Sequence, residues 1–339
     1  MMDLNIAWFL LIGVLLTGYA VLDGFDLGVG VLQMFNRDEK QQDVQLATIG
    51  PVWDGNEVWL LTAGGAMFAA FPIVYATVFS GYYLALILLL LALIFRAVGL
   101  EFRGQIQSPA WKRFWSVAVG LGSFLPAVLF GVALGNIIRG LPIAADGSLN
   151  ITLLDLLNPY SILIGVLSLA MFLMHGAAFL AARTDGELRE SMARCTIVGW
   201  VMFAVLYVAT TVATMFVSPF IFEGLTANPL LWVLAVLLVA SAACVPLFNR
   251  AGKYIRAFLA SAISIAAVVG LMGLGLFPRM VPSSTDLANS LTIYNASSTP
   301  LTLTVMLVIA LVGMPLVIGY TAFIYTIFMR KGHPLHEGY

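Results

Sequence analysis

The amino-acid sequence predicts an all-α protein embedded in a membrane, with nine transmembrane helices arranged in bundles. Of its 339 residues, 61% are hydrophobic and only 10% are charged, whereas a soluble domain carries about 25% charged residues. Nine apolar stretches are long enough to cross a bilayer core, which takes about 20 residues of α-helix. Lys and Arg are concentrated in alternate loops, as expected when those loops are cytoplasmic.

The apolar stretches set the expected helices in chain order. The first leads into Asp-Gly-Phe-Asp and not into a small-residue cleavage site, so we interpret it as a retained helix. The division of the second long stretch rests on Phe71-Pro72, because proline commonly marks a helix boundary. The remaining loops are too short for a soluble domain, so residues 1–339 are expected to form a single integral membrane domain. We expect helices near residues 6–33, 52–72, 74–98, 113–138, 158–182, 196–219, 229–248, 255–277 and 302–329.

The basic residues decide the orientation of these helices. With the N-terminus outside, the outer loops hold only Arg139 and Arg279, and Arg96 lies within the third helix. Merging the second and third helices would place basic loops on both sides of the membrane, which is atypical. The sequence therefore predicts a periplasmic N-terminus and a cytoplasmic C-terminus. Thirteen of the sixteen Lys and Arg then lie inside: Arg37, Lys40, Arg103, Lys112, Arg113, Arg183, Arg189, Arg194, Arg250, Lys253, Arg256, Arg330 and Lys331.

Charge, cysteines and histidines exclude several functions. A formal net charge of -1 provides no basic field for nucleic acid. Cys195 and Cys244 are far apart and lie beside or inside apolar runs, so we expect two buried thiols and no disulfide or metal pair. His175, His333 and His336 are too few and too scattered for a multi-histidine metal centre. Any redox cofactor would have to be held mostly by another chain.

Five ionisable residues stand out because a charge at the bilayer centre costs about 2.5–3.5 kcal/mol on insertion scales. Asp23 and Asp26 are three residues apart, on one face of the first helix. Asp54 opens the second helix, with Glu57 one turn further, and Arg96 lies at the inner end of the third. We expect the three helices to bring all five residues together. Such a cluster is typical of a proton relay or a buried anion site.

Each of these candidates also has an ordinary structural interpretation. Asp54 could complement the N-terminal dipole of its helix, and Asp23 and Asp26 could simply be hydrated at the membrane edge. His175, near two methionines, could be an axial haem ligand, although a lone helical histidine is more often a hydrogen-bonded packing residue. At the level of the whole chain, the alternatives are an independent proton-coupled transporter with its site between inverted repeats, or a haem protein using His175.

Three segments carry a family resemblance. They are residues 22–30 (LDGFDLGVG), 51–60 (PVWDGNEVWL) and 277–285 (FPRMVPSST), and further short motifs connect them in the right order. On these segments the chain resembles subunit II of the bacterial cytochrome bd quinol oxidases. Each motif is only moderately specific, but the set spans nearly the whole chain.

The resemblance implies a respiratory enzyme of the bacterial cytoplasmic membrane. Enzymes of this family reduce dioxygen to water with electrons from a membrane quinol and take the protons from the cytoplasm. Their haems b and d are held by subunit I, so this chain would ligate neither haem and would be inactive alone. The resemblance implies subunit I as partner, and it allows a small single-helix subunit and a bound quinone.

The resemblance also assigns roles to single residues. The residues matching Asp26 and Asp54 belong to a proton-conducting route in such oxidases, and the arginine matching Arg96 lies close to the haem-bearing interface. Asp23 opens the same motif and is included in the route. Glu57 stands where some relatives have glutamine, so it would add a carboxylate.

Overall fold

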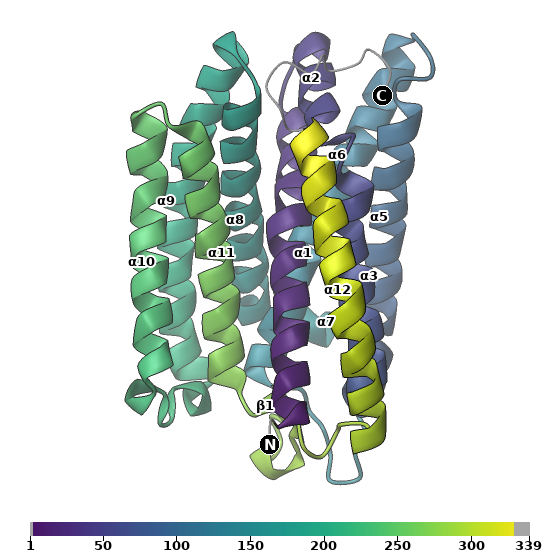
Figure 1. Cartoon of the computed structure of the whole chain (residues 1–339), viewed down its shortest axis with the longest axis vertical. Helices are drawn as coiled ribbons and strands as arrows, with labels where there is room; N and C mark the ends of the chain where they lie inside the picture. Colours follow the sequence, from purple (N-terminus) through teal and green to yellow (C-terminus); the bar gives the residue numbers. More distant parts are fainter. Residues whose placement is uncertain (1–2, 329–339) are drawn as a thin grey trace.

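The computed structural model describes residues 3–328, which are mostly helical (Figure 1). His333, His336, Arg330 and Lys331 therefore lie outside the described residues. The helices are α1 (Leu4–Met34), α2 (Glu39–Ile49), α3 (Trp53–Ala70), α4 (Pro72–Gly81), α5 (Tyr83–Phe102), α6 (Pro109–Arg139), α7 (Leu153–Leu156), α8 (Pro159–Arg183), α9 (Gly186–Val217), α10 (Pro229–Arg250), α11 (Tyr254–Leu276) and α12 (Pro300–Phe328). Short 3-10 turns are η1 (Pro219–Phe222), η2 (Leu225–Ala227) and η3 (Leu287–Asn289), and β1 (Arg279–Val281) pairs antiparallel with β2 (Leu291–Thr292).

Eight of the described helices are long and apolar enough to cross a membrane: α1, α5, α6, α8, α9, α10, α11 and α12. Helix α3 has 18 residues and is less apolar, because its first turns carry Asp54, Asn56 and Glu57. It runs antiparallel to α1. Asn56 bonds to α1 near one end of α3, and the Ala70 carbonyl at the other end accepts from the backbone of Ser298, close to the start of α12.

The long helices form two side-by-side bundles (Figure 1). Helices α8, α9, α10 and α11 make one bundle, and α1, α3, α5, α6 and α12 make the other. The bundles meet where α8 packs against α1 and α6. A mostly helical membrane fold, as predicted from the sequence, is therefore confirmed.

Glycines allow the close contact between the bundles. A Cβ built on Gly28 of α1 would overlap the carbonyl oxygen of Phe172 in α8. On α6, a Cβ on Gly131 would lie 2.6 Å from the carbonyl oxygen of Ile164. Each of these glycines belongs to a G-x-x-x-G spacing, Gly24 with Gly28 and Gly131 with Gly135. Both spacings pack against α8, a partner that the spacing itself could not indicate.

One predicted helix is divided. The stretch expected as a helix near residues 74–98 is broken after Gly81, and α5 begins only at Tyr83. The break lets Tyr82 turn inward, where it is buried and donates to the carbonyl oxygen of Ala133 at 3.2 Å. The expected boundary at Phe71-Pro72 is present, since α3 ends at Ala70 and α4 begins at Pro72.

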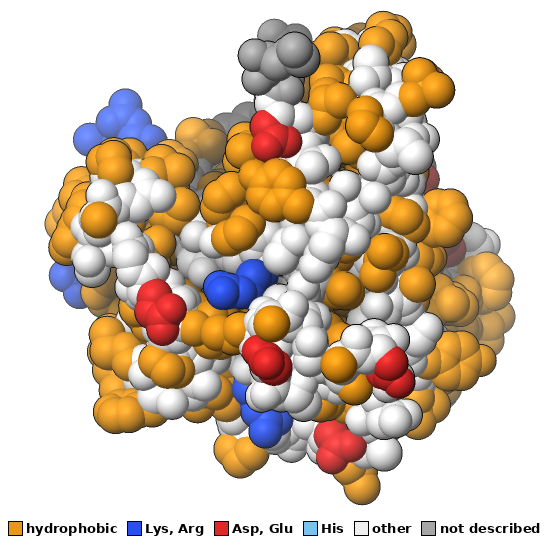
Figure 2. Space-filling model, turned by 90° about the horizontal axis from the view of Figure 1, so that it is seen from below, with side chains coloured by type: hydrophobic (Ala, Val, Ile, Leu, Met, Phe, Trp, Pro, Cys, Tyr) orange, Lys and Arg blue, Asp and Glu red, His pale blue; other side chains and the backbone are white. Residues whose placement is uncertain are grey.

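Different elements close the two ends of the molecule. The end at which α1 begins contains β1, β2 and the long loops, and Figure 2 shows charged side chains scattered there over a largely hydrophobic and uncharged surface. Helix α2 covers the opposite end of α1, with Asp38 as its N-cap.

The burial of the two cysteines differs from the prediction. Cys195 and Cys244 are each half-buried and not fully buried.

Candidate functional site

Arg96 is the centre of a buried charge cluster. It lies on α5, and its side chain and that of Asp23 on α1 are both fully buried. The guanidinium donates two hydrogen bonds to the Asp23 carboxylate, from Nη2 to Oδ1 at 2.5 Å and from Nη1 to Oδ2 at 3.0 Å. Such fork-to-fork pairs combine charge with a fixed geometry. The sequence expectation that Arg96 would meet the acidic residues of the first helix is therefore met by Asp23.

Asp26 forms the second part of the cluster. Its Oδ2 lies 3.9 Å from Arg96 Nη2, and it accepts a hydrogen bond from Asn56 Nδ2 at 2.7 Å. Asn56 in turn accepts from the hydroxyl of Tyr325 on α12 at 3.0 Å. A chain of hydrogen bonds thus connects Asp26 with α12, through residues of three different helices.

The two acidic residues of α3 have different environments. Glu57 reaches the cluster, with Oε1 3.2 Å from Arg96 Nη1, while its side chain keeps 23% of its surface exposed. Asp54 lies one turn earlier, is exposed, and makes no hydrogen bond or ion pair within the described residues. The expectation that all five residues meet is therefore wrong for Asp54. Its side chain leaves the first turn of α3 on the outer face, which also carries Gly55 and Val58.

His175 is a packing residue in this structure. Its Nδ1 lies 2.6 Å from the hydroxyl of Ser261, and its Nε2 lies 3.0 Å from the carbonyl oxygen of Val21. The ring is stacked on Phe258. Both nitrogens are therefore engaged, which leaves none for a haem iron. No group of three or more His, Cys, Asp or Glu able to hold a metal ion occurs in residues 3–328.

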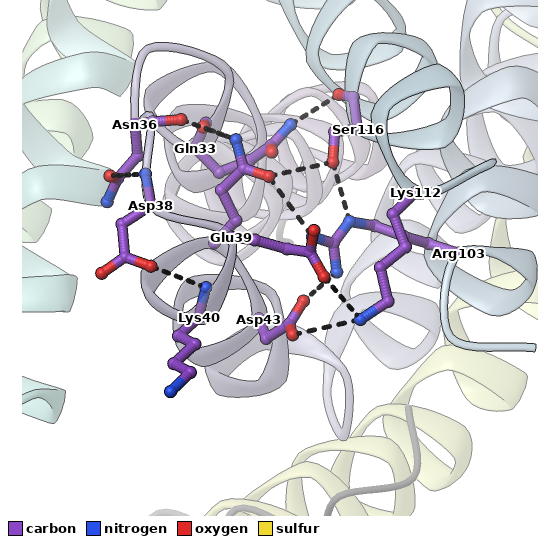
Figure 3. Close-up of polar contacts among 10 residues, drawn as sticks. Gln33, Asn36, Asp38, Glu39, Lys40, Asp43, Arg103, Lys112 and Ser116 are labelled. Carbon is purple, nitrogen blue, oxygen red and sulfur yellow. Dashed lines mark hydrogen bonds and ion pairs between the residues drawn. The ribbon is translucent and has the colours of Figure 1, made fainter. Parts of the chain in front are cut away.

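A second polar network lies where α2 covers the ends of α1, α5 and α6 (Figure 3). Arg103 pairs with Asp43 and donates from Nε to the hydroxyl of Ser116 at 2.7 Å. Lys112 pairs with Glu39 at 2.9 Å. Gln33, at the end of α1, donates to the backbone carbonyl of Ser116 at 2.7 Å. The ion pairs to Asp43 and Glu39 hold α2 over the bundle, and the bonds to Ser116 join α1 and α5 to α6 beneath it.

Sequence reasoning missed Asn56 and Tyr325. Asn56 is a polar residue with only 1% of its surface exposed, and it lies between Asp54 and Glu57 in the sequence. An amide beside two acidic candidates in an apolar helix was a usable signal. Tyr325 offered no such signal, because its role depends on how α12 packs against α3.

The fold and the cluster define a multi-pass helical membrane protein with several carboxylates buried around one arginine. The chain belongs to the cytochrome bd terminal oxidase subunit II family, whose sequence model matches residues 4–328. It is accordingly a multi-pass protein of the bacterial cytoplasmic membrane. The resemblance found in the sequence is confirmed.

Named relatives agree with this assignment over almost the full chain. Cytochrome bd-I ubiquinol oxidase subunit 2 of Escherichia coli (strain K12) is 38% identical over 353 residues, covering 95% of this chain and 93% of the relative. Cytochrome bd ubiquinol oxidase subunit 2 of Bacillus subtilis (strain 168) is 39% identical over 334 residues, covering 98% and 97%. The solved structure of bd oxidase from Geobacillus thermodenitrificans shares the fold, with a TM-score of 0.77 at 17% identity, covering 96% of this chain and 99% of that chain.

Proposed function

We propose that this chain is the non-haem-ligating subunit of a cytochrome bd-type quinol oxidase, in which it scaffolds subunit I and conducts protons from the cytoplasm. The family and the named relatives support the enzyme class. The haems b and d would be held by subunit I, in agreement with the fully engaged ring of His175. The independent transporter is not favoured, because the relatives are oxidase subunits.

The proposal of a proton route rests on the charge balance of the buried cluster. Asp23, Asp26 and Glu57 all approach a single arginine. Three carboxylates around one cation leave an excess of negative charge in a low-dielectric site, unless protons are bound there. A site that must hold protons to be balanced, and that exchanges them among neighbouring carboxylates, is suited to relay them.

Asp54 retains a role in this proposal at the surface. It is exposed on the outer face of α3, and a Cβ on Gly55 beside it would meet open space. Helix α12 is also largely uncovered. Only 6% of the residues in its most apolar segment are buried, compared with 72% of those in the corresponding segment of α8. We propose that subunit I covers α3 and α12 and that Asp54 passes protons across this contact. A structural quinone and a small single-helix subunit remain predictions of the resemblance.

The orientation of the chain is part of the same proposal. Nine crossings result if α3, with α4, is counted with the eight long apolar helices. The N-terminus is then periplasmic, and the α2 network with its basic residues faces the cytoplasm. The buried cluster lies toward that side, which is where the enzyme would take up protons.

The test is the variant Asp26→Asn in the complex assembled with subunit I. We expect quinol oxidase turnover to fall at least about tenfold, the lower range of what one proton-transferring group contributes, while haem content stays close to normal. Asp54→Asn should also lower turnover. Glu223→Gln, which alters an exposed carboxylate remote from the cluster, is the control. Unchanged turnover in Asp26→Asn would remove this carboxylate from the route.

A further inference from the structure

The contact region shared by α1, α5 and α6 forms a seam along the bundle. Two layers of polar residues lie in this seam, two helical turns apart. The inner layer belongs to the buried cluster, and the outer layer belongs to the α2 network (Figure 3). Seven residues of α-helix span about 10.5 Å, so α1 and α5 each contribute one residue to each layer. The pairs, each seven residues apart, are Asp26 and Gln33 on α1, and Arg96 and Arg103 on α5. On α6, Ser116 belongs to the outer layer, and Ser123 lies beside Gly30 of α1 and donates to the carbonyl oxygen of Val119 at 2.8 Å.

Buried polar atoms without a hydrogen-bond partner among the described residues occur in both layers. In the outer layer this atom is Oε1 of Gln33, and in the inner layer the atoms are Oδ1 of Asp26 and Nε of Arg96. All three side chains are fully buried. Buried polar groups are almost always paired, and internal water supplies the partner where protein does not. Both layers are therefore suited to bind water.

Val119 of α6 separates the two layers. Its side chain is fully buried, and its two methyl groups reach toward two different helices. A Cβ on Gly30 of α1 would lie 3.6 Å from Cγ1 of Val119, and a Cβ on Gly99 of α5 would lie 2.7 Å from Cγ2. Gly99 thus provides the space that Val119 fills, while the space at Gly30 is taken mainly by Ser123, whose Oγ would overlap a Cβ there. Val119 belongs to a buried apolar cluster with Phe25, Val29 and Leu100, so apolar side chains occupy this level of the seam.

We propose that this seam is the cytoplasmic inlet to the buried cluster and that Val119 is its hydrophobic gate, which opens when water briefly enters. The inference rests on the proposed function, because it names the entrance of the same proton route. An excess proton from the cytoplasm would pass along hydrogen-bonded water from Gln33 to the Asp26 carboxylate. Each O–H bond broken in a water is replaced by a new one, so no further reactant is needed. Apolar constrictions gate other membrane pores by wetting and drying.

Cysteine labelling tests whether water reaches Val119. In the assembled complex with Cys195 and Cys244 replaced by alanine, Val119→Cys is compared with Val132→Cys. Val132 is a buried valine of the same helix that packs against α8 instead. Because only a hydrated thiol ionises and reacts, we expect a small water-soluble thiol reagent to modify position 119 at least about tenfold faster. Equal rates at the two positions would overturn the proposal.

A second pair of variants tests whether the inlet carries protons. Gln33→Met removes the unpartnered oxygen at the outer side of the gate. Gln45→Met is the matched control, because Gln45 of α2 is equally buried and also has an unpartnered Oε1, but contacts Met192 outside the seam. We expect Gln33→Met to lower turnover several-fold and to raise its solvent isotope effect, with haem content retained, while Gln45→Met has neither effect. Identical behaviour of the two variants would overturn the proposal.

The two proposals fail separately. If Asp26→Asn lowers turnover but Val119→Cys is not labelled faster than Val132→Cys, the proton route remains and this inlet is wrong. If Val119→Cys is labelled rapidly while Asp26→Asn has full turnover, the seam admits water but the proposed proton route is wrong.

Discussion

Replacing Arg96 by glutamine removes the cation that holds the buried cluster together. Three carboxylates approach its guanidinium, and the pair with Asp23 is fully buried. Removing one partner of a buried ion pair costs about 3–5 kcal/mol, because the remaining charge is left unpaired. Since about 1.4 kcal/mol corresponds to a tenfold change in an equilibrium, the ratio of folded to unfolded chain should fall by two orders of magnitude or more.

The matched control is Arg103→Gln, on the same helix and two turns away. Arg103 is itself buried, but it pairs with Asp43, whose side chain is 43% exposed. The carboxylate left behind there is hydrated, so the main loss is the hydrogen bond from Nε to Ser116, and we expect a smaller destabilisation of about 2 kcal/mol. Both variants are expressed with subunit I. The amount of haem in the purified complex and the temperature at which the haem absorbance is lost are then measured.

A double variant separates charge from packing. The double variant combines Asp23→Asn with Arg96→Gln, so that the arginine and the carboxylate that pairs with it are both removed. We therefore expect the double variant to recover part of the stability that Arg96→Gln loses. A complex of Arg96→Gln with full haem content and the stability of Arg103→Gln would refute the reasoning, and so would a double variant less stable than Arg96→Gln.

Two further predictions concern packing. Tyr325→Phe deletes the hydrogen bond to Asn56 and should lower stability by about 1 kcal/mol, measured as an earlier thermal loss of haem absorbance; an unchanged transition would contradict it. Gly28→Val should prevent assembly, because its side chain would overlap the backbone of Phe172. Gly13→Val, on the same helix, is the control, since a Cβ there meets open space, and normal haem yield from Gly28→Val would contradict the close approach of α1 and α8.

The helices could be predicted from the sequence because the bilayer imposes a simple requirement. A segment that crosses the hydrocarbon core must be apolar over its whole length and must satisfy its own backbone hydrogen bonds. The break at Tyr82 was not predictable in this way, because the apolar stretch continues on both sides of Ser80-Gly81 and an isolated glycine is tolerated within a helix. Tyr82 turns inward to reach Ala133 of α6, a contact that depends on the arrangement of the helices.

For the candidate site residues too, the sequence predicted one part and the tertiary structure decided the other. Asp23, Asp26, Glu57 and Arg96 were recognisable in the sequence, because ionisable side chains in apolar segments are costly and therefore rare. Sequence spacing placed Asp54 with them, but the rotation of α3 directs Glu57 toward Arg96 and leaves Asp54 exposed.

The sequence by itself determined that this is a membrane protein, which side chains carry its buried charges, and its family. These properties depend on composition and local spacing, which every residue carries regardless of its neighbours. Only the tertiary structure decided that Asn56 and Tyr325 join the cluster and that Val119 lies between the cluster and the α2 network. Contacts between helices depend on how each helix is rotated and on where glycines permit close approach, and neither is encoded at a single position.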